Sequence, residues 1–109
     1  MPWQEQIKQE LAKAAEGLQN GNEGLARVCA RRAVSIGAQQ WSAQRHKSAW
    51  QGDAMHQLRH IHNEPTFPLP VKNAAQRLLT TVTEQAHLPM TTDPITDARI
   101  ILDYLNSQF

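Results

Sequence analysis

The apolar residues of this chain recur with the period of an α-helix, and this spacing limits its fold more than any other feature. Between Trp3 and Leu18 an apolar residue returns every three or four positions, with Glu, Gln and Lys in most of the gaps. Such spacing places the apolar side chains along one side of a helix. No segment alternates apolar and polar residues as a half-buried strand does. The pattern therefore predicts an all-α protein.

Turn and cap residues mark where the first two helices end and begin. Gly21 closes the first helix, because glycine readily adopts the left-handed backbone found at a helix C-terminus. Asn22 then caps a second helix, which is predicted from residue 23 to at least 40 and at most 50. Because the link between them is so short, the two helices run antiparallel and pack on each other.

The second half of the chain carries signals of the same kind. Asp53 is placed to cap a short third helix, and three prolines within residues 64–70 predict an extended connector. A fourth helix begins at Pro70 and ends before Pro89, and Asp-Pro at 93–94 starts the last helix. The apolar stripe of the fourth helix comprises Val71, Ala75, Leu78, Val82 and Ala86. The expected fold is an antiparallel, up-and-down bundle of four long helices plus one short helix.

The second helix is apolar over a wide arc. Leu25 and Val28 occupy part of this arc, beside a strip of small residues where a neighbouring helix can come close. That strip consists of Ala26, Ala30 and Gly37. Arg32 falls between Leu25 and Val28 on the helical wheel, which predicts that Arg32 is buried. It then pairs with a carboxylate of the last helix, Asp97 or Asp103, or it faces a groove or a second subunit; we favour the internal ion pair.

Length and composition exclude several classes of protein. With 109 residues, 40% of them hydrophobic, the chain has the size of one globular domain spanning residues 1–109. It lacks an apolar run of about twenty residues, and its first five residues lack the basic start and apolar centre of a secretory signal. We therefore expect a cytoplasmic protein without membrane contact. A single cysteine, Cys29, forms no internal disulfide and no cysteine-rich zinc cluster, so packing must hold the fold.

No catalytic motif is recognisable in the sequence. It contains no phosphate-binding loop, no dinucleotide fingerprint and no Gly-x-Ser-x-Gly nucleophile elbow. Cys29 lies in the middle of a predicted helix among apolar residues, where a thiol behaves as a small hydrophobic group. We therefore favour a non-enzymatic protein with no catalytic residue and no cofactor.

Asp53, His56 and His60 form the best candidate for a metal site. Their spacing of three and four residues places all three on one side of the third helix, where both histidines can reach one divalent cation. A complete site also needs a fourth ligand from elsewhere in the chain. The alternative, which we favour, is that these are exposed histidines opposite the apolar side of the helix.

Basic residues are concentrated in residues 24–62, which carry six of them against one acid. Five of the six are candidates for contact with an anion or a nucleic acid: Arg27, Arg31, Arg32, Arg45 and Lys47. The alternative is that basic helices and the acidic last helix attract one another inside the bundle. We favour this second interpretation.

Trp41 and Trp50 flank a short basic stretch that contains Arg45 and Lys47. Flat aromatic surface beside cations can stack on bases, or it can form the centre of a protein interface. A third interpretation is that both indoles cover one end of the bundle while the basic residues are solvated. Of the two functional interpretations we favour the protein interface, because the stretch has too few Lys and Arg residues to follow a phosphate backbone.

Residues 24–40, Gly-Leu-Ala-Arg-Val-Cys-Ala-Arg-Arg-Ala-Val-Ser-Ile-Gly-Ala-Gln-Gln, resemble the second helix of HEPN-type bacterial domains. This resemblance implies an up-and-down bundle that pairs as a dimer, in a family that includes RNA-cleaving toxins and non-catalytic partners. The catalytic members carry an Arg followed four to six residues later by a His. Here Arg59 and His62 are too close, and Arg77 and His87 are too far apart. The resemblance therefore implies neither ribonuclease activity nor any site residue.

Two functions follow as expectations. The first is a non-enzymatic helical bundle that acts through protein–protein contacts, as a homodimer or with another protein. The alternative is a nucleotide- or RNA-binding HEPN-like domain that uses the basic segment 24–62.

Overall fold

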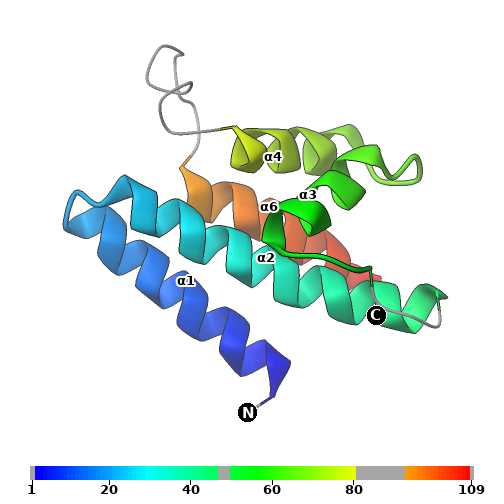
Figure 1. The fold of residues 1–109 in the computed structure, drawn as a ribbon, viewed down its shortest axis with the longest axis horizontal. Coiled ribbons are helices and arrows are strands. Elements are labelled where there is room, and N and C mark those ends of the chain that lie inside the picture. The colour runs from blue at the N-terminus through cyan, green and yellow to red at the C-terminus, as the bar shows by residue number, and fades with distance from the viewer. Residues whose placement is uncertain (1, 47–49, 81–92, 109) are drawn as a thin grey trace.

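The structure, a computed structural model, describes residues 2–46, 50–80 and 93–108 of the chain. Within these ranges the secondary structure is entirely helical (Figure 1). The helices are α1 (Trp3–Gln19), α2 (Glu23–His46), α3 (Ala54–Asn63), α4 (Leu69–Leu79) and α6 (Pro94–Ser107). The prediction of an all-α fold is confirmed. None of the helices in these ranges is long and apolar enough to cross a membrane.

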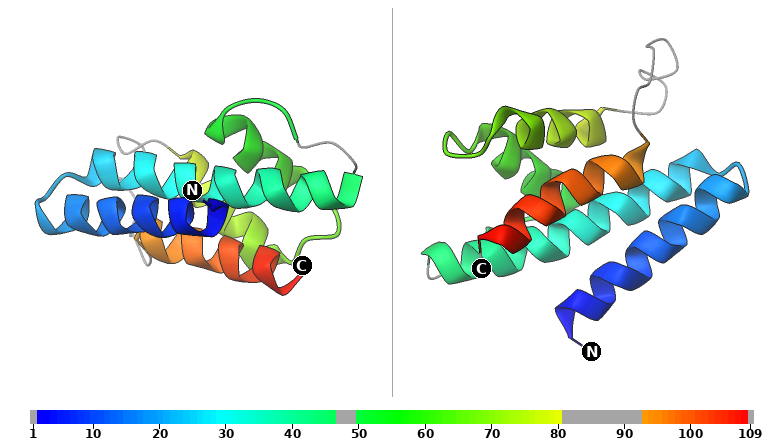
Figure 2. Two further views of the ribbon diagram at one scale, coloured as in Figure 1. Left: turned by 90° about the horizontal axis from the view of Figure 1, so that it is seen from below. Right: turned by 180° about the vertical axis from the view of Figure 1, so that it is seen from behind.

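The central helix of the bundle is α2, which contacts α1, α3 and α6, while α4 packs on α3 and α6. In Figure 1, α1 lies on one side of α2, and α3 and α4 lie on the other. The chain runs in one direction through α1 and α4 and in the opposite direction through α2 and α6, as the right-hand view of Figure 2 also shows. This antiparallel arrangement confirms the predicted up-and-down bundle.

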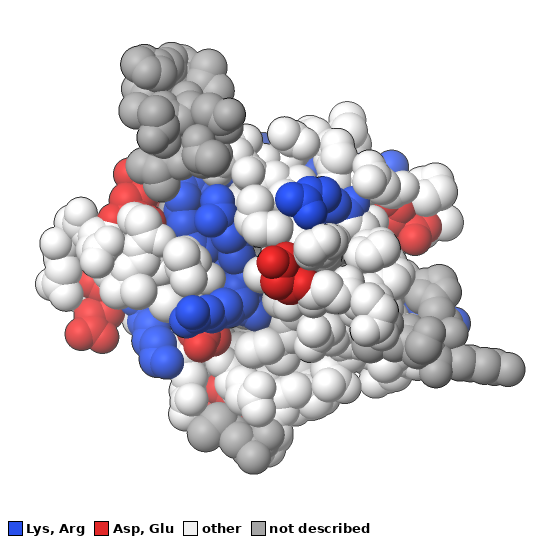
Figure 3. Space-filling view, viewed as in Figure 1, with Lys and Arg blue, Asp and Glu red and all other residues white. Residues whose placement is uncertain are grey.

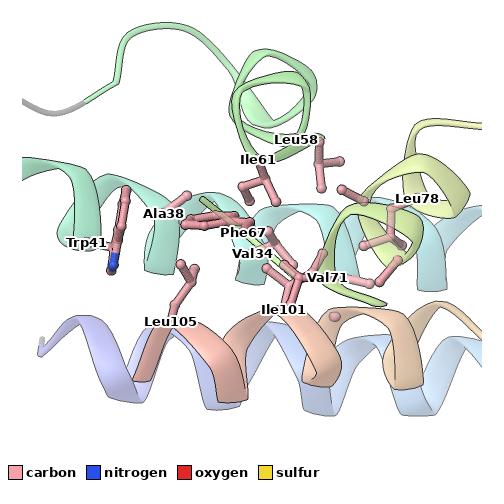
Figure 4. Packing of buried hydrophobic residues seen from close by; sticks show 14 residues of the cluster. Val34, Ala38, Trp41, Leu58, Ile61, Phe67, Val71, Leu78, Ile101 and Leu105 are labelled. Carbon is pink, nitrogen blue, oxygen red and sulfur yellow. The ribbon is translucent and has the colours of Figure 1, made fainter. Parts of the chain in front are cut away.

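The main core lies between α2, α3, α4 and α6 (Figure 4). Its large, fully buried side chains are Leu58, Ile61, Leu78, Ile101 and Leu105. Trp41 and Phe67 belong to the same cluster and are almost fully buried. These aliphatic and aromatic side chains supply the apolar burial that a chain without a disulfide needs.

Small residues join α1 to α2. Ala14 of α1 packs against Ala26 and Cys29 of α2 in a second, smaller cluster. Gly17 lies at the same contact, where a Cβ atom would stand 3.1 Å from the carbonyl oxygen of Asn22 and 3.2 Å from the backbone nitrogen of Ala26. The two helices of this hairpin therefore approach so closely that a side chain at position 17 would press on backbone.

The buried side of α2 is its strip of small residues, and not the side that carries Leu25 and Val28. The buried small residues of this helix are Ala26, Ala30, Ala33, Gly37 and Ala38. Leu25 and Val28 are 43% and 39% exposed, and Arg32 on the same side is also exposed. The prediction that Arg32 is buried is therefore wrong. Where an apolar arc is wide, close helix packing selects its small residues for the contact.

The predicted caps are present. Gly21 has a φ angle of +75°, and Asn22 accepts a hydrogen bond at 3.0 Å from the backbone N–H three residues later. Asp53 and Asp93 accept equivalent hydrogen bonds at 3.1 and 2.7 Å at the starts of α3 and α6. The end of α2 at His46 falls inside its predicted limits.

The fourth helix ends earlier than the sequence predicts. Pro70 is its second residue, and Thr80 leaves the helix with an extended ψ angle of 140°. The stripe positions Val82 and Ala86 lie outside the described residues. The prediction of one continuous helix from Pro70 to the residue before Pro89 is therefore wrong, because the helix is interrupted at Thr80.

Candidate functional site

Arg27 is the arginine that α2 buries. Its side chain is only 1% exposed, because it shares a side of the helix with Val34 and Ala38. Nη1 of Arg27 donates a hydrogen bond at 3.3 Å to the backbone carbonyl oxygen of Arg77, in the last turn of α4. The buried arginine expected in α2 therefore exists, but it lies at position 27 and not at Arg32.

Arg31, one turn further along α2, reaches the same end of α4. Its Nε donates at 2.7 Å to the carbonyl oxygen of Leu78, and its Nη2 donates at 3.3 Å to that of Thr80. The last carbonyl groups of a helix have no partner within the helix and lie at the negative end of its dipole. Arg27 and Arg31 together therefore hold the C-terminal end of α4 against α2.

An internal ion pair joins α4 to α6. Asp97 is fully buried, and its Oδ1 accepts a hydrogen bond at 2.8 Å from Nε of Arg77. An acid of the last helix thus pairs with an arginine, but this arginine is Arg77 of α4 and not Arg32, for which the pair was predicted. Asp103, the other acid considered as a partner of Arg32, is exposed.

Burial and a neighbouring positive charge both disfavour the charged form of Arg27. Burial lowers the pKa of Arg27, and the positive charge of Arg31 lowers it further. Nε and Nη2 of Arg27 are buried without a hydrogen-bond acceptor among the described residues. The nearby charges of Glu23 and Asp97 act in the opposite direction and favour the charged guanidinium.

The predicted anion-binding residues that the structure describes do not form one surface. Figure 3 shows Lys and Arg side chains gathered over the N-terminal half of α2. Arg27 and Arg31 use their guanidinium groups to hold α4, whereas Arg32 is exposed. Arg45 is exposed near the other end of α2 and donates to the backbone carbonyl oxygen of Gln108. Lys47 lies outside the described residues.

Two residues of the candidate metal site, Asp53 and His56, contact each other, whereas His60 contacts a tryptophan. Nδ1 of His56 lies 2.8 Å from Oδ1 of Asp53, and hydrogen bonds from the backbone and ring of His56 lower the pKa of Asp53. The ring of His60 instead stacks on Trp50, with centroids 5.0 Å apart and planes at 14°. The described residues contain no group of three or more His, Cys, Asp or Glu side chains that could hold a metal ion.

Trp41 and Trp50 belong to an aromatic cluster at one end of the core. Trp41 is 6% exposed and packs edge to face on Phe67, with centroids 5.0 Å apart. Trp50 is partly buried beside it, at 5.3 Å, and Arg45 lies over the Trp41 ring. The two indoles therefore pack together at one end of the core, and the buried Trp41 offers little surface to a partner.

Cys29 is buried in the contact between α1 and α2. It is 1% exposed, and burial raises the pKa of its thiol, with the charge of Glu10 adding to the effect. Because the thiolate is the reactive form, we expect native Cys29 to react with a disulfide reagent such as dithionitrobenzoate only as fast as the protein opens. The labelling rate with and without denaturant measures this. Equal rates in both would show that the α1/α2 contact is loose.

A groove of about 290 Å³ lies between α1 and α6. Its apolar lining residues are Trp3, Ile7, Leu11, Leu102 and Leu105, with Gly37 of α2 at the base. Four of these five apolar side chains are only partly buried, while Leu105 is covered. α1 packs firmly on α2 but barely touches α6, which leaves the groove open.

Gly37 shows how the groove is built. A Cβ atom at this position would stand 2.7 Å from Cδ2 of Leu102 and 3.7 Å from Cδ1 of both Ile7 and Leu105. Side chains from α1 and α6 therefore converge over the glycine. The helix α2 forms the base of the groove because position 37 has no side chain.

Polar and charged residues line both edges of the groove. Gln4 and Lys8 of α1 stand on one edge, and Arg99, Asp103 and Asn106 of α6 on the other. All five are exposed. An apolar base between polar edges is the usual composition of a surface that binds a partner helix.

This groove was not predicted from the sequence. The stripe from Trp3 to Leu18 predicted α1 correctly, but a stripe does not reveal which of its residues a neighbouring helix covers. The signal that was available is Gly37, a glycine within the buried strip of α2. A glycine inside a helix indicates a close approach or an empty space above it.

Comparison with known proteins finds no matching protein-family model, no matching curated protein and no matching solved structure. The resemblance of residues 24–40 to HEPN-type domains therefore stays a prediction. The function of this chain is therefore inferred from its fold and from the residues on its surface.

Proposed function

We propose that this chain is a non-enzymatic interaction module that binds a protein partner in the groove between α1 and α6. The observation that carries the proposal is the apolar base of the groove, where Trp3, Ile7, Leu11 and Leu102 remain partly exposed. Apolar side chains that a fold leaves uncovered, bordered by polar residues, mark sites of protein contact. A helix that presents two or three apolar side chains on one side has the shape and chemistry to fill the groove.

The alternative, a nucleotide- or RNA-binding domain, has less support. Phosphate binding needs guanidinium groups that are free to meet a ligand. Arg27 and Arg31 belong to the basic segment, but they donate hydrogen bonds to backbone carbonyl groups at the C-terminal end of α4. Among the residues predicted to contact an anion, Arg32 and Arg45 are exposed, but they lie thirteen residues apart along α2.

Selection from a library of displayed helical peptides, randomised along one side, tests the proposal. The immobilised protein should enrich peptides with apolar residues three and four positions apart. We expect Ile7→Glu to weaken the binding of these peptides by at least about tenfold, because the substitution places a charge in the apolar base of the groove. Gln9→Glu, an exposed position of α1 outside the groove, is the matched control and should leave binding unchanged.

Circular dichroism of both variants checks that they are folded. Peptides that bind wild type and Ile7→Glu equally well would place the binding surface elsewhere. Failure to enrich any peptide that depends on Ile7, with protein immobilised at a density low enough to keep it monomeric, would contradict the proposed function.

A further inference from the structure

We infer that the groove between α1 and α6 binds the same groove of a second copy of this chain. This inference rests on the proposed function and adds the identity of the partner. The charges on the two edges of the groove, their positions along it and the apolar residues between them indicate a second copy of the chain as the occupant.

The charges on the edges of the groove form no ion pair with the part of the chain that the structure describes. Lys8 stands on the α1 edge, and Arg99 and Asp103 stand on the α6 edge. All three are exposed, and none of them forms an ion pair with another described residue. Lys8 and Asp103, which have opposite charges, therefore face solvent on opposite edges of an apolar base.

Lys8 and Asp103 stand at about the same level along the groove. The tips of Ile7 and Leu102 both converge over Gly37, as the short distances to a Cβ atom there show. Lys8 and Asp103 are the residues that directly follow them in α1 and α6. Gly37 thus fixes the register of the two edges and places these opposite charges across the groove from each other.

A two-fold axis along the groove makes this arrangement self-complementary. Such an axis places α1 of each copy over α6 of the other, so that Lys8 of one copy meets Asp103 of the second, and the reverse. Because α1 and α6 run in opposite directions within one copy, the helices that meet across the axis are also antiparallel. The contact occurs twice and needs no other partner.

The same pairing covers the apolar residues that the single chain leaves open. Trp3, Ile7 and Leu11 of each copy would pack against Leu102 of the other, and the four helices would form a second, intermolecular core. Arg99 is the one edge charge that these contacts leave without an acid. A separate protein that presents an acidic helix is the rival occupant, because Arg99 and Lys8 together favour a carboxylate.

Sedimentation equilibrium from low to high micromolar concentration measures the association. We expect the wild-type mass to approach twice the 12.3 kDa of one chain. Lys8→Glu and Asp103→Lys should each weaken the dimer by at least about tenfold, because each places like charges together twice. The double variant Lys8→Glu with Asp103→Lys exchanges the signs and should restore association to near the wild-type value. Arg59→Glu, an exposed position on α3 with the same change of charge, is the control.

The outcomes separate this inference from the proposed function. A monomer at every concentration that still selects peptides dependent on Ile7 would overturn the inference and leave the proposed function standing. A monomer that selects no such peptide would overturn both. A dimer that the single charge reversals do not weaken, or that the double variant fails to restore, would also overturn the inference, because copies would then meet through another surface.

Discussion

Arg77→Met is expected to lower the free energy of unfolding by about 3 kcal/mol, the lower end of the range found when a buried ion pair loses one partner, because the Arg77 side chain is 32% exposed. The substitution removes the Nε atom that lies 2.8 Å from Oδ1 of Asp97. Asp97 is fully buried, so its carboxylate cannot recover the lost interaction from solvent. Methionine keeps much of the side-chain volume of arginine. The loss of unfolding free energy therefore comes mainly from the lost charge interaction and not from a cavity. Urea unfolding followed by circular dichroism measures it.

Arg32→Met is the matched control for this prediction. It makes the same chemical change at an exposed position of α2 and should alter the free energy of unfolding by less than about 0.5 kcal/mol. Adding Asp97→Leu to Arg77→Met should recover part of the loss, because an apolar pair can replace a buried ion pair. Equal losses in Arg32→Met and Arg77→Met would contradict the assignment of Arg77 as the partner of the buried acid.

Ile101→Ala is expected to cost about 2–5 kcal/mol, as large-to-small substitutions in a core do. Ile101 is fully buried, and its side chain points toward Val34 of α2 and Val71 of α4 (Figure 4). Three helices meet at this side chain, so their backbones cannot all close the space that alanine would leave. A loss of this size is a large share of the stability of a small domain.

Ile100→Ala provides the comparison on the neighbouring residue. Ile100 is partly exposed, so the same deletion removes less buried surface and leaves a space that water can enter. Its loss in urea unfolding should be clearly smaller than that of Ile101→Ala. If the two variants lost equal stability, α6 would not be oriented as described.

Helix positions and caps were predictable from the sequence because they depend on local interactions. Asn22, Asp53 and Asp93 each cap a helix through an N–H three residues away, and Gly21 adopts the left-handed backbone expected of it. Such contacts involve only neighbouring residues, so a short stretch of sequence contains all the information they need.

The rotation of α2 within the bundle was not predictable in this way. Its apolar arc includes large residues such as Leu25 and Val28 as well as the strip of small residues, and periodicity does not rank one above the other. The approach of α1 at Gly17 decides between them, since only small residues fit at that contact. The error at Arg32 and the unpredicted burial of Arg27 have this single cause, because both positions follow the rotation of the helix.

The groove and the partners of Arg27 depend on contacts between distant parts of the chain. Arg27 and Arg31 bind backbone carbonyl groups, which every residue carries and which therefore leave no mark in the sequence. Likewise, the edges of the groove come from α1 and α6, at opposite ends of the chain. Only the packing of α1 and α6 on α2 brings Lys8 and Asp103 to the same level.

The two arginines of α2 also bear on the order in which this chain folds. Their hydrogen bonds to α4 join residues 50 and 47 positions apart, whereas a turn at Gly21 closes the α1/α2 hairpin. Contacts between distant residues form slowly, because the intervening chain must first lose conformational entropy. We therefore expect the hairpin to form before α4 docks. Interactions that form after the transition state act on the unfolding rate, so we expect Arg27 and Arg31 to determine how long α4 stays docked and not how quickly the chain collapses.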